Sequence, residues 1–169
     1  MKAVSVVTLR KELKHRSNED LLELCLRLSK FKKENKELLT YLLFEAHDEL
    51  GYIASVKKEI DEQFTTINTS SYFYVKKSVR KILRMIKKYA KYSLKKETEV
   101  ELLLHFCNVL LKFDPELFKN VTIGNIYERQ ILFIKKLVAT LHEDLQYDYQ
   151  VELEKLEATS TPLKARVYF

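Results

Sequence analysis

Glycine and proline are scarce throughout this chain, which contains only two of each among its 169 residues. Sheets joined by tight turns need more of both, because glycine supplies positive φ angles and proline fixes the entry to a turn. Gly51 and Gly124 each stand alone, so the sequence also lacks a glycine-rich phosphate-binding loop. The scarcity predicts long helices with few connections, and therefore an all-α protein.

The composition is that of a globular protein with a charged surface: 46% of the residues are hydrophobic and 32% are charged. We predict a single compact helical domain over residues 1–158, with about six to eight helices. Either an irregular bundle or a short stack of helical hairpins, as in α-solenoids, fits this pattern. Thr159-Ser160-Thr161-Pro162 is expected to end regular structure, which leaves residues 159–169 as a flexible tail.

The helical spacing of apolar residues predicts where the helices lie. Ser17 and Asp20 have the spacing of a capping box, Asn35 is an expected N-cap, and Gly51 is expected to end or kink a helix. The segment before Gly51 is predicted to be buried on most sides, and the apolar helix at 97–113 to lie at the centre. The expected helices cover residues 4–15, 18–31, 36–50, 52–67, 72–94, 97–113 and 126–147, with a short turn at 116–119 after Asp114-Pro115 and an extension or last helix at 151–158.

Cys25 and Cys107 both fall within apolar helical patterns. This placement predicts two buried, unreactive thiols in a reducing compartment. The N-terminal apolar run is too short and too polar for a signal peptide, and no stretch approaches about 18 uncharged apolar residues. We therefore expect a cytoplasmic protein without a transmembrane segment.

Residues 19–31 and 101–113 share a pattern of identical residues, which includes Cys25 and Cys107 at equivalent positions. Duplication of a helical hairpin would produce this similarity, as in stacked helical repeats. Leucine-rich amphipathic helices also resemble one another by chance, so both explanations remain open.

The segment Asn-Lys-Glu-Leu-Leu-Thr-Tyr-Leu-Leu-Phe-Glu-Ala at residues 35–46 resembles an uncharacterised group of bacterial all-helical proteins. The likeness runs along most of the chain, through residues 97–107 and 142–149. The resemblance implies a compact helical fold. It carries no assigned activity and no catalytic or binding residues.

Residues 75–96 form the most distinctive segment, with ten basic residues and no acidic one. The whole chain has a net charge of +6, so its positive balance comes entirely from this segment. On a helical wheel the apolar residues lie on one side and most basic residues lie opposite. Like charges four residues apart repel each other, which favours an anionic partner. The candidate anion- or partner-binding face consists of Lys77, Arg80, Arg84, Lys87, Lys88, Lys91 and Lys95.

Four interpretations of this face compete. The lysines could simply be solvated, or they could dock against the acidic stretch at residues 143–157. An acidic protein or peptide could bind there. A nucleic acid could bind through its phosphates, with Tyr72, Tyr74 and Tyr92 available for stacking. A membrane surface is a weaker fit, since the apolar face contains no tryptophan and resembles a core.

No catalytic motif is visible, and the histidines His15, His47, His105 and His142 lack the spacing of helical metal sites. His105 is expected to be a hydrogen-bonded core residue. We therefore expect no enzyme, no cofactor and no metal, and the oligomeric state stays open. The leading hypothesis is a helical binding or scaffold protein that acts through protein–protein contacts. A nucleic-acid-binding module is the alternative, and an enzyme with an unrecognised site is the third.

Overall fold

A computed structural model describes residues 2–113 and 120–165, with side chains as far as residue 160. Within this part of the chain, the regular elements are eight α-helices and one π-helix, which confirms the all-α class. The prediction placed one domain over residues 1–158, whereas the chain divides into two compact units at residues 1–45 and 46–169. Each unit is described by itself.

The first unit contains short helices: α1 (Val6–Leu13), α2 (Asn18–Phe31), α3 (Lys33–Thr40) and the π-helix η1 (Tyr41–Glu45). The predicted capping box is present, because Ser17 Oγ accepts from the Asp20 amide at 3.1 Å and Asp20 Oδ2 accepts from the Ser17 amide at 3.3 Å. The prediction that Asn35 is an N-cap is wrong, because Lys32 stands at the N-cap position of α3. Asn35 Nδ2 donates instead to the carbonyl of Leu28 in α2 at 2.9 Å.

Burial in the first unit corrects two predictions. Tyr41 is its only buried residue within the described part of the chain, and the apolar residues of α2, α3 and η1 are exposed or half-buried. The segment before Gly51 is therefore not buried on most sides, and Cys25 is exposed. A helical pattern identifies which side chains share a face, but three short helices supply too little surface to cover those faces.

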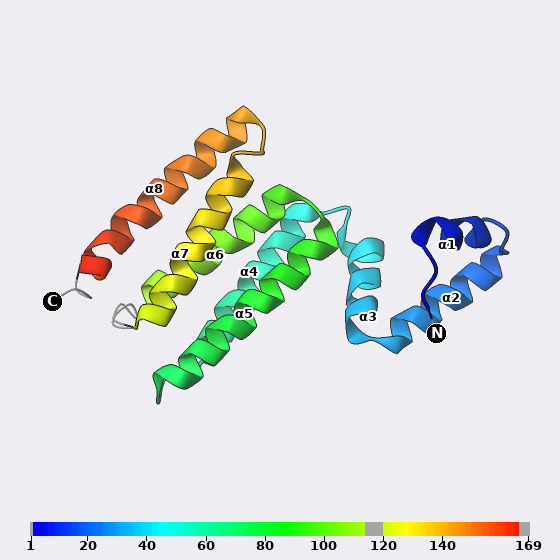
Figure 1. Ribbon diagram of the computed structural model, residues 1–169, viewed down its shortest axis with the longest axis horizontal. Coiled ribbons are helices and arrows are strands. Elements are labelled where there is room, and N and C mark those ends of the chain that lie inside the picture. Colours follow the sequence, from blue (N-terminus) through cyan, green and yellow to red (C-terminus); the bar gives the residue numbers. More distant parts are fainter. Residues whose placement is uncertain (1, 114–119, 166–169) are drawn as a thin grey trace. The chain divides into compact units, whose positions relative to one another are not determined.

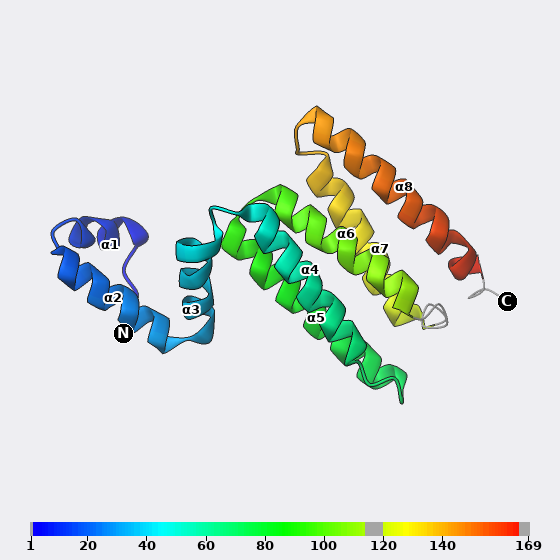
Figure 2. The same ribbon diagram turned by 180° about the vertical axis from the view of Figure 1, so that it is seen from behind.

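The second unit is a bundle of α4 (Glu49–Thr65), α5 (Tyr72–Ser93), α6 (Lys96–Phe113), α7 (Val121–Val138) and α8 (Glu143–Ala165). Helix α6 packs against α4, α5, α7 and α8, and the other helices surround it (Figures 1 and 2). The prediction that residues 97–113 lie at the centre is confirmed, because nine of the α6 side chains are buried. Cys107 is among them, as predicted. The segments that resemble each other, at 19–31 and 101–113, are thus both helical but differ in burial.

Helices α7 and α8 differ from the prediction of one helix over residues 126–147. Helix α7 ends at Val138, and the Leu137 carbonyl accepts from both the Thr140 amide at 2.9 Å and Thr140 Oγ1 at 2.7 Å. Helix α8 then continues to Ala165, past the expected end at residue 159. Within α8, the hydroxyls of Thr159 and Ser160 donate to the carbonyls of Lys155 and Glu157. The predicted break at Asp114-Pro115 and the turn at 116–119 lie outside the described residues.

Gly51 lies in the first turn of α4, so it neither ends nor kinks the helix as was predicted. Asp48 is the N-cap, and its Oδ1 accepts from the Gly51 amide at 3.0 Å. A Cβ atom on Gly51 would lie only 2.3 Å from Asp48 Oδ2. Glycine at this position therefore leaves room for the capping carboxylate.

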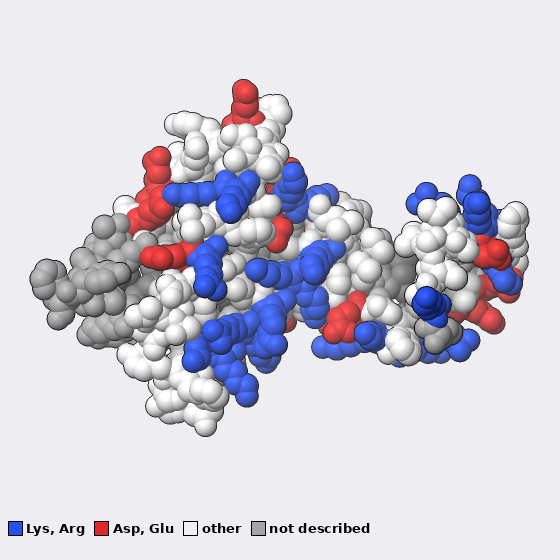
Figure 3. All heavy atoms as spheres, viewed as in Figure 1, with Lys and Arg blue, Asp and Glu red and all other residues white. Residues whose placement is uncertain are grey.

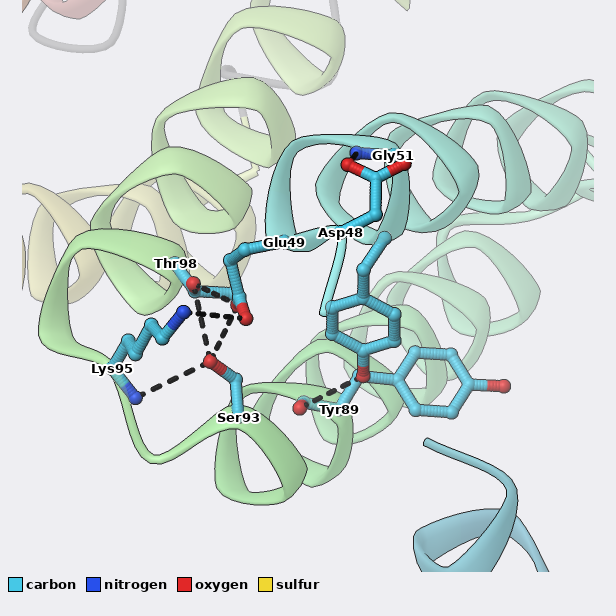
Figure 4. A network of polar contacts seen from close by, with 8 residues as sticks. Asp48, Glu49, Gly51, Tyr89, Ser93, Lys95 and Thr98 are labelled. Atoms are coloured by element: carbon cyan, nitrogen blue, oxygen red, sulfur yellow. Dashed lines mark hydrogen bonds and ion pairs between the residues drawn. The ribbon is translucent and has the colours of Figure 1, made fainter. Parts of the chain in front are cut away.

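The turn between α5 and α6 is held to the start of α4 by the Glu49 carboxylate (Figure 4). Its Oε1 accepts from Ser93 Oγ and Thr98 Oγ1, both at 2.5 Å, and its Oε2 lies 3.1 Å from Lys95 Nζ. Between these residues, Leu94 adopts a left-handed conformation with φ of 60°, although it is a branched residue and 85% exposed. This conformation costs free energy for any residue with a Cβ atom.

Truncating the core side of α5 should destabilise the second unit. Ile86 is fully buried, so Ile86→Ala should lower the free energy of unfolding by roughly 2–5 kcal/mol through the cavity it leaves. Urea denaturation followed by circular dichroism measures the change. Leu132→Ala, at an exposed leucine of α7, should change it by less than about 0.5 kcal/mol. Equal effects of the two changes would show that Ile86 is not a core residue.

Relieving the strain at Leu94 should stabilise the protein. We expect Leu94→Gly to raise the free energy of unfolding by roughly 0.5–1 kcal/mol, since glycine adopts a positive φ without steric cost. Leu94→Ala is the matched control, because it removes the same exposed side chain and keeps the Cβ atom. A glycine variant no more stable than the alanine variant would contradict the left-handed conformation.

Candidate functional site

Helix α5 turns its basic residues to solvent because its apolar residues form one side of the core. Val75, Val79, Ile82 and Ile86 are buried, and they recur at helical spacing. The opposite side carries exposed basic residues and gathers Lys and Arg side chains over α5 in one view (Figure 3). The exposed basic residues of this helix are Lys77, Arg80, Lys81, Arg84, Lys87 and Lys91.

A groove of about 580 Å³ follows this side of α5. Two apolar side chains take part in it, namely the exposed ring of Phe73 and the half-buried Leu83. All the other lining residues are cations. We call this feature the basic groove, and its lining residues are Phe73, Lys76, Lys77, Arg80, Leu83, Arg84 and Lys87.

The structure brings together only part of the predicted face. Four of its seven residues line the basic groove, and Lys91 is exposed on the next turn of α5. Lys88 is half-buried, with its Nζ 4.7 Å from the centroid of the Tyr89 ring. Lys95 lies beyond the end of α5 and pairs with Glu49. The four residues in the groove are Lys77, Arg80, Arg84 and Lys87.

Three groove residues were not part of the predicted face: Phe73, Lys76 and Leu83. At 100° per residue, Lys76 falls between Leu83 and Lys87, so a helical wheel contains the signal for it. The two apolar residues are harder to recognise, because an apolar residue beside a basic face is ordinarily assigned to the core. Only the packing of α5 shows that Phe73 is exposed.

Two lysines of the groove contact aromatic rings. Lys87 Nζ lies 5.5 Å from the centroid of Phe133 in α7, and Lys76 Nζ lies 6.0 Å from that of Phe73. Such cation–π contacts contribute about 0.5–1 kcal/mol at exposed sites. In both contacts it is the ammonium nitrogen that lies beside the ring, which positions the two lysine side chains along the groove.

The acidic stretch at residues 143–157 docks elsewhere in the bundle. Helix α8, which contains it, packs against α6 and α7. Glu157 Oε1 lies 2.7 Å from Lys135 Nζ of α7, and Asp144 Oδ2 lies 3.3 Å from His142 Nδ1. The exposed lysines and arginines of the basic groove thus remain accessible.

A second depression, of about 360 Å³, is polar and lies where α4, α6 and α8 meet. Lys57 Nζ lies 2.5 Å from Glu101 Oε2, and the Tyr149 hydroxyl donates to Glu101 Oε1 at 3.2 Å. His105 Nε2 lies 2.7 Å from Asp61 Oδ1. His105 is hydrogen-bonded, as predicted, but it stands at the edge of this depression and not in the core.

The residues of the polar depression were missed because they come from helices far apart in the sequence. Lys57 and Glu101 form an ion pair, and so do His105 and Asp61 when the histidine is protonated. The arrangement joins α4 to α6 and fits a structural cluster of ion pairs. Within the described residues, no group of three His, Cys, Asp or Glu side chains could hold a metal ion.

Three groups in the second unit are kept neutral by burial. Desolvation raises the pKa of Tyr149 far above its usual value, and the nearby Glu101 carboxylate raises it further. Burial also raises the pKa of the Tyr127 hydroxyl, which donates to the Leu156 carbonyl at 3.2 Å, and that of the Cys107 thiol. Cys107 is therefore unsuited to act as a thiolate nucleophile.

Comparisons with protein-family models, curated proteins and solved structures found no match. The resemblance of residues 35–46 to a bacterial helical group therefore stays a prediction. In the part of the chain that the structure describes, no helix is both long and apolar enough to cross a membrane.

The buried tyrosines should make the protein sensitive to alkali. In the unfolded chain a tyrosine ionises near pH 10, whereas burial raises the folded pKa of Tyr149 and Tyr127. Stability is therefore fully present below about pH 10 and is lost as the pH rises above it. Urea denaturation at increasing pH should show this loss, and Tyr149→Phe should reduce its slope. Tyr147→Phe, at an exposed tyrosine, should leave the slope unchanged, and a pH-independent wild type would contradict the assignment.

Proposed function

We propose that this is a non-enzymatic binding protein whose basic groove takes an acidic, amphipathic helical segment of a protein partner. The observation that carries the proposal is the combination of five cations with two apolar side chains in one groove. Cations alone would suit any anion, whereas exposed apolar surface needs an apolar counterpart.

The dimensions of the groove fit a helix. It extends from Phe73 to Lys87, which corresponds to roughly 20 Å along α5 or about four helical turns. An amphipathic helix of that length could set its apolar residues on Phe73 and Leu83 and its carboxylates against the flanking cations. Binding would also relieve the repulsion between Lys76, Arg80 and Arg84, which are spaced four residues apart.

A single-stranded nucleic acid is the second candidate. Tyr72, Phe73 and Tyr74 are all exposed at the start of the groove, where bases could stack while the cations contact phosphates. Leu83 would have no apolar partner in a complex with a nucleic acid, and we therefore rank the nucleic acid second.

The proposal places the protein in the cytoplasm. Its support is the pair of free cysteines, which suits a reducing compartment.

Charge reversal in the groove should abolish binding of a labelled helical peptide that carries leucines on one face and glutamates on the other. We expect Arg80→Glu with Arg84→Glu to weaken binding at least about tenfold, because attraction becomes repulsion. Phe73→Ala should weaken it as well, through lost apolar contact. Fluorescence anisotropy measures both changes.

The matched control is Lys58→Glu with Lys112→Glu, which reverses the same charge at two exposed residues outside the groove. This variant should bind the peptide like the wild type. A peptide of the same composition without an apolar face should bind the wild type more weakly. Equal binding of both peptides would contradict the proposal. Strongly salt-dependent binding of an oligouridine alone would support the second candidate.

A further inference from the structure

Helix α2 presents an apolar surface that its own unit does not cover. Leu28 is 59% exposed and Phe31 is 77% exposed, and neither α1, α2 nor α3 contains a buried residue. A helix of 14 residues is marginally stable in water by itself. A unit of this size without a core needs additional packing from outside. The apolar side of α2 therefore has the properties of an interface.

The apolar residues and the charges occupy neighbouring sides of α2. Leu21, Leu24, Leu28 and Phe31 recur at three- and four-residue spacing, which places them on one side of the helix. Beside them runs a hollow of about 710 Å³. Its lining contains two leucines and five charged residues: Arg16, Asp20, Glu23, Leu24, Leu26, Arg27 and Lys30.

The order of these charges makes α2 complementary to itself. The acidic Asp20 and Glu23 precede the basic Arg27 and Lys30 along the helix. When two copies of α2 lie antiparallel, the same side of each helix meets, and the acidic half of one lies beside the basic half of the other. A parallel arrangement would place like charges together.

We infer that two copies of this chain associate through α2, antiparallel and around a two-fold axis near residue 25. Asp20 pairs with Lys30 of the second copy, and Glu23 pairs with Arg27 of the second copy. Both pairings are symmetric about residue 25, as a closed two-fold interface requires. Association removes Leu28 and Phe31 from water, which supplies the stabilisation that the first unit lacks.

A second copy fits this surface, because Asp20, Glu23, Arg27 and Lys30 each find a residue of opposite charge across the two-fold axis. The surface also lies outside the basic groove, so the inference is independent of the proposed function.

The test exchanges charges between the two copies. Glu23→Arg places arginine at both positions 23 and 27 of each α2, and Arg27→Glu places glutamate at both positions. Each variant alone should dimerise at least about tenfold more weakly than the wild type, because like charges then face each other. An equimolar mixture of the two variants should form heterodimers, and the double variant E23R/R27E should form homodimers. Sedimentation velocity measures the association.

The mixture separates this interface from effects within one helix. Glu23 and Arg27 are four residues apart, so each single variant also loses any pairing inside its own helix. Mixing cannot restore an intrahelical pair, whereas it restores the pair between copies. Circular dichroism of each variant checks that its helices are retained.

A wild type that stays monomeric at high concentration would overturn the inference. So would single variants that dimerise like the wild type, or a mixture that gains no heterodimer.

Discussion

The packing of α6 is the constraint on which the second unit depends. Its apolar residues surround the helix, so they can be buried only if other helices cover every side of it. Helices α4, α5, α7 and α8 provide that cover, and each needs an apolar residue set on one side alone. The orientation of α5 follows from this requirement. Because Val79 and Ile86 pack against the core, the lysines and arginines on the opposite side of α5 face solvent.

The apolar pattern predicted this part of the structure, because residues that share one face of a helix are buried together when that face packs against the core. Ile82 and Ile86 share a helical face in the sequence and are buried in the structure. The pattern failed at the end of α7, because the apolar spacing continues from Leu137 to Leu141 although the helix stops at Val138. It failed in the first unit for another reason. Cys25 lies in an amphipathic pattern, but a pattern does not show whether a partner helix exists.

The basic groove and the polar depression differ in how far the sequence could reveal them. The cations of the groove lie on one helix, so their spacing along α5 put four of the five on the predicted face. Lys88, Lys91 and Lys95 of that face do not line the groove, and Lys95 lies beyond α5 because the left-handed Leu94 turns the chain away after Ser93. The pairs Lys57–Glu101 and His105–Asp61 join residues about forty positions apart, and only the parallel packing of α4 and α6 brings them together. No spacing rule for a single helix contains that information.

Charge compensation distinguishes the polar depression from the two surfaces that we assign to partners. Lys57 and Glu101 satisfy each other, so their charges are already compensated and need no ligand. In the basic groove, Arg80 and Arg84 are exposed among other cations, and within the described lining of the groove no carboxylate lies beside them. On α2 the hollow carries charges of both signs, and the acids Asp20 and Glu23 precede the bases Arg27 and Lys30 along the helix. A surface whose charges are all positive is complementary to an acidic partner. A surface whose acidic and basic residues are related by a two-fold axis is complementary to a second copy of itself.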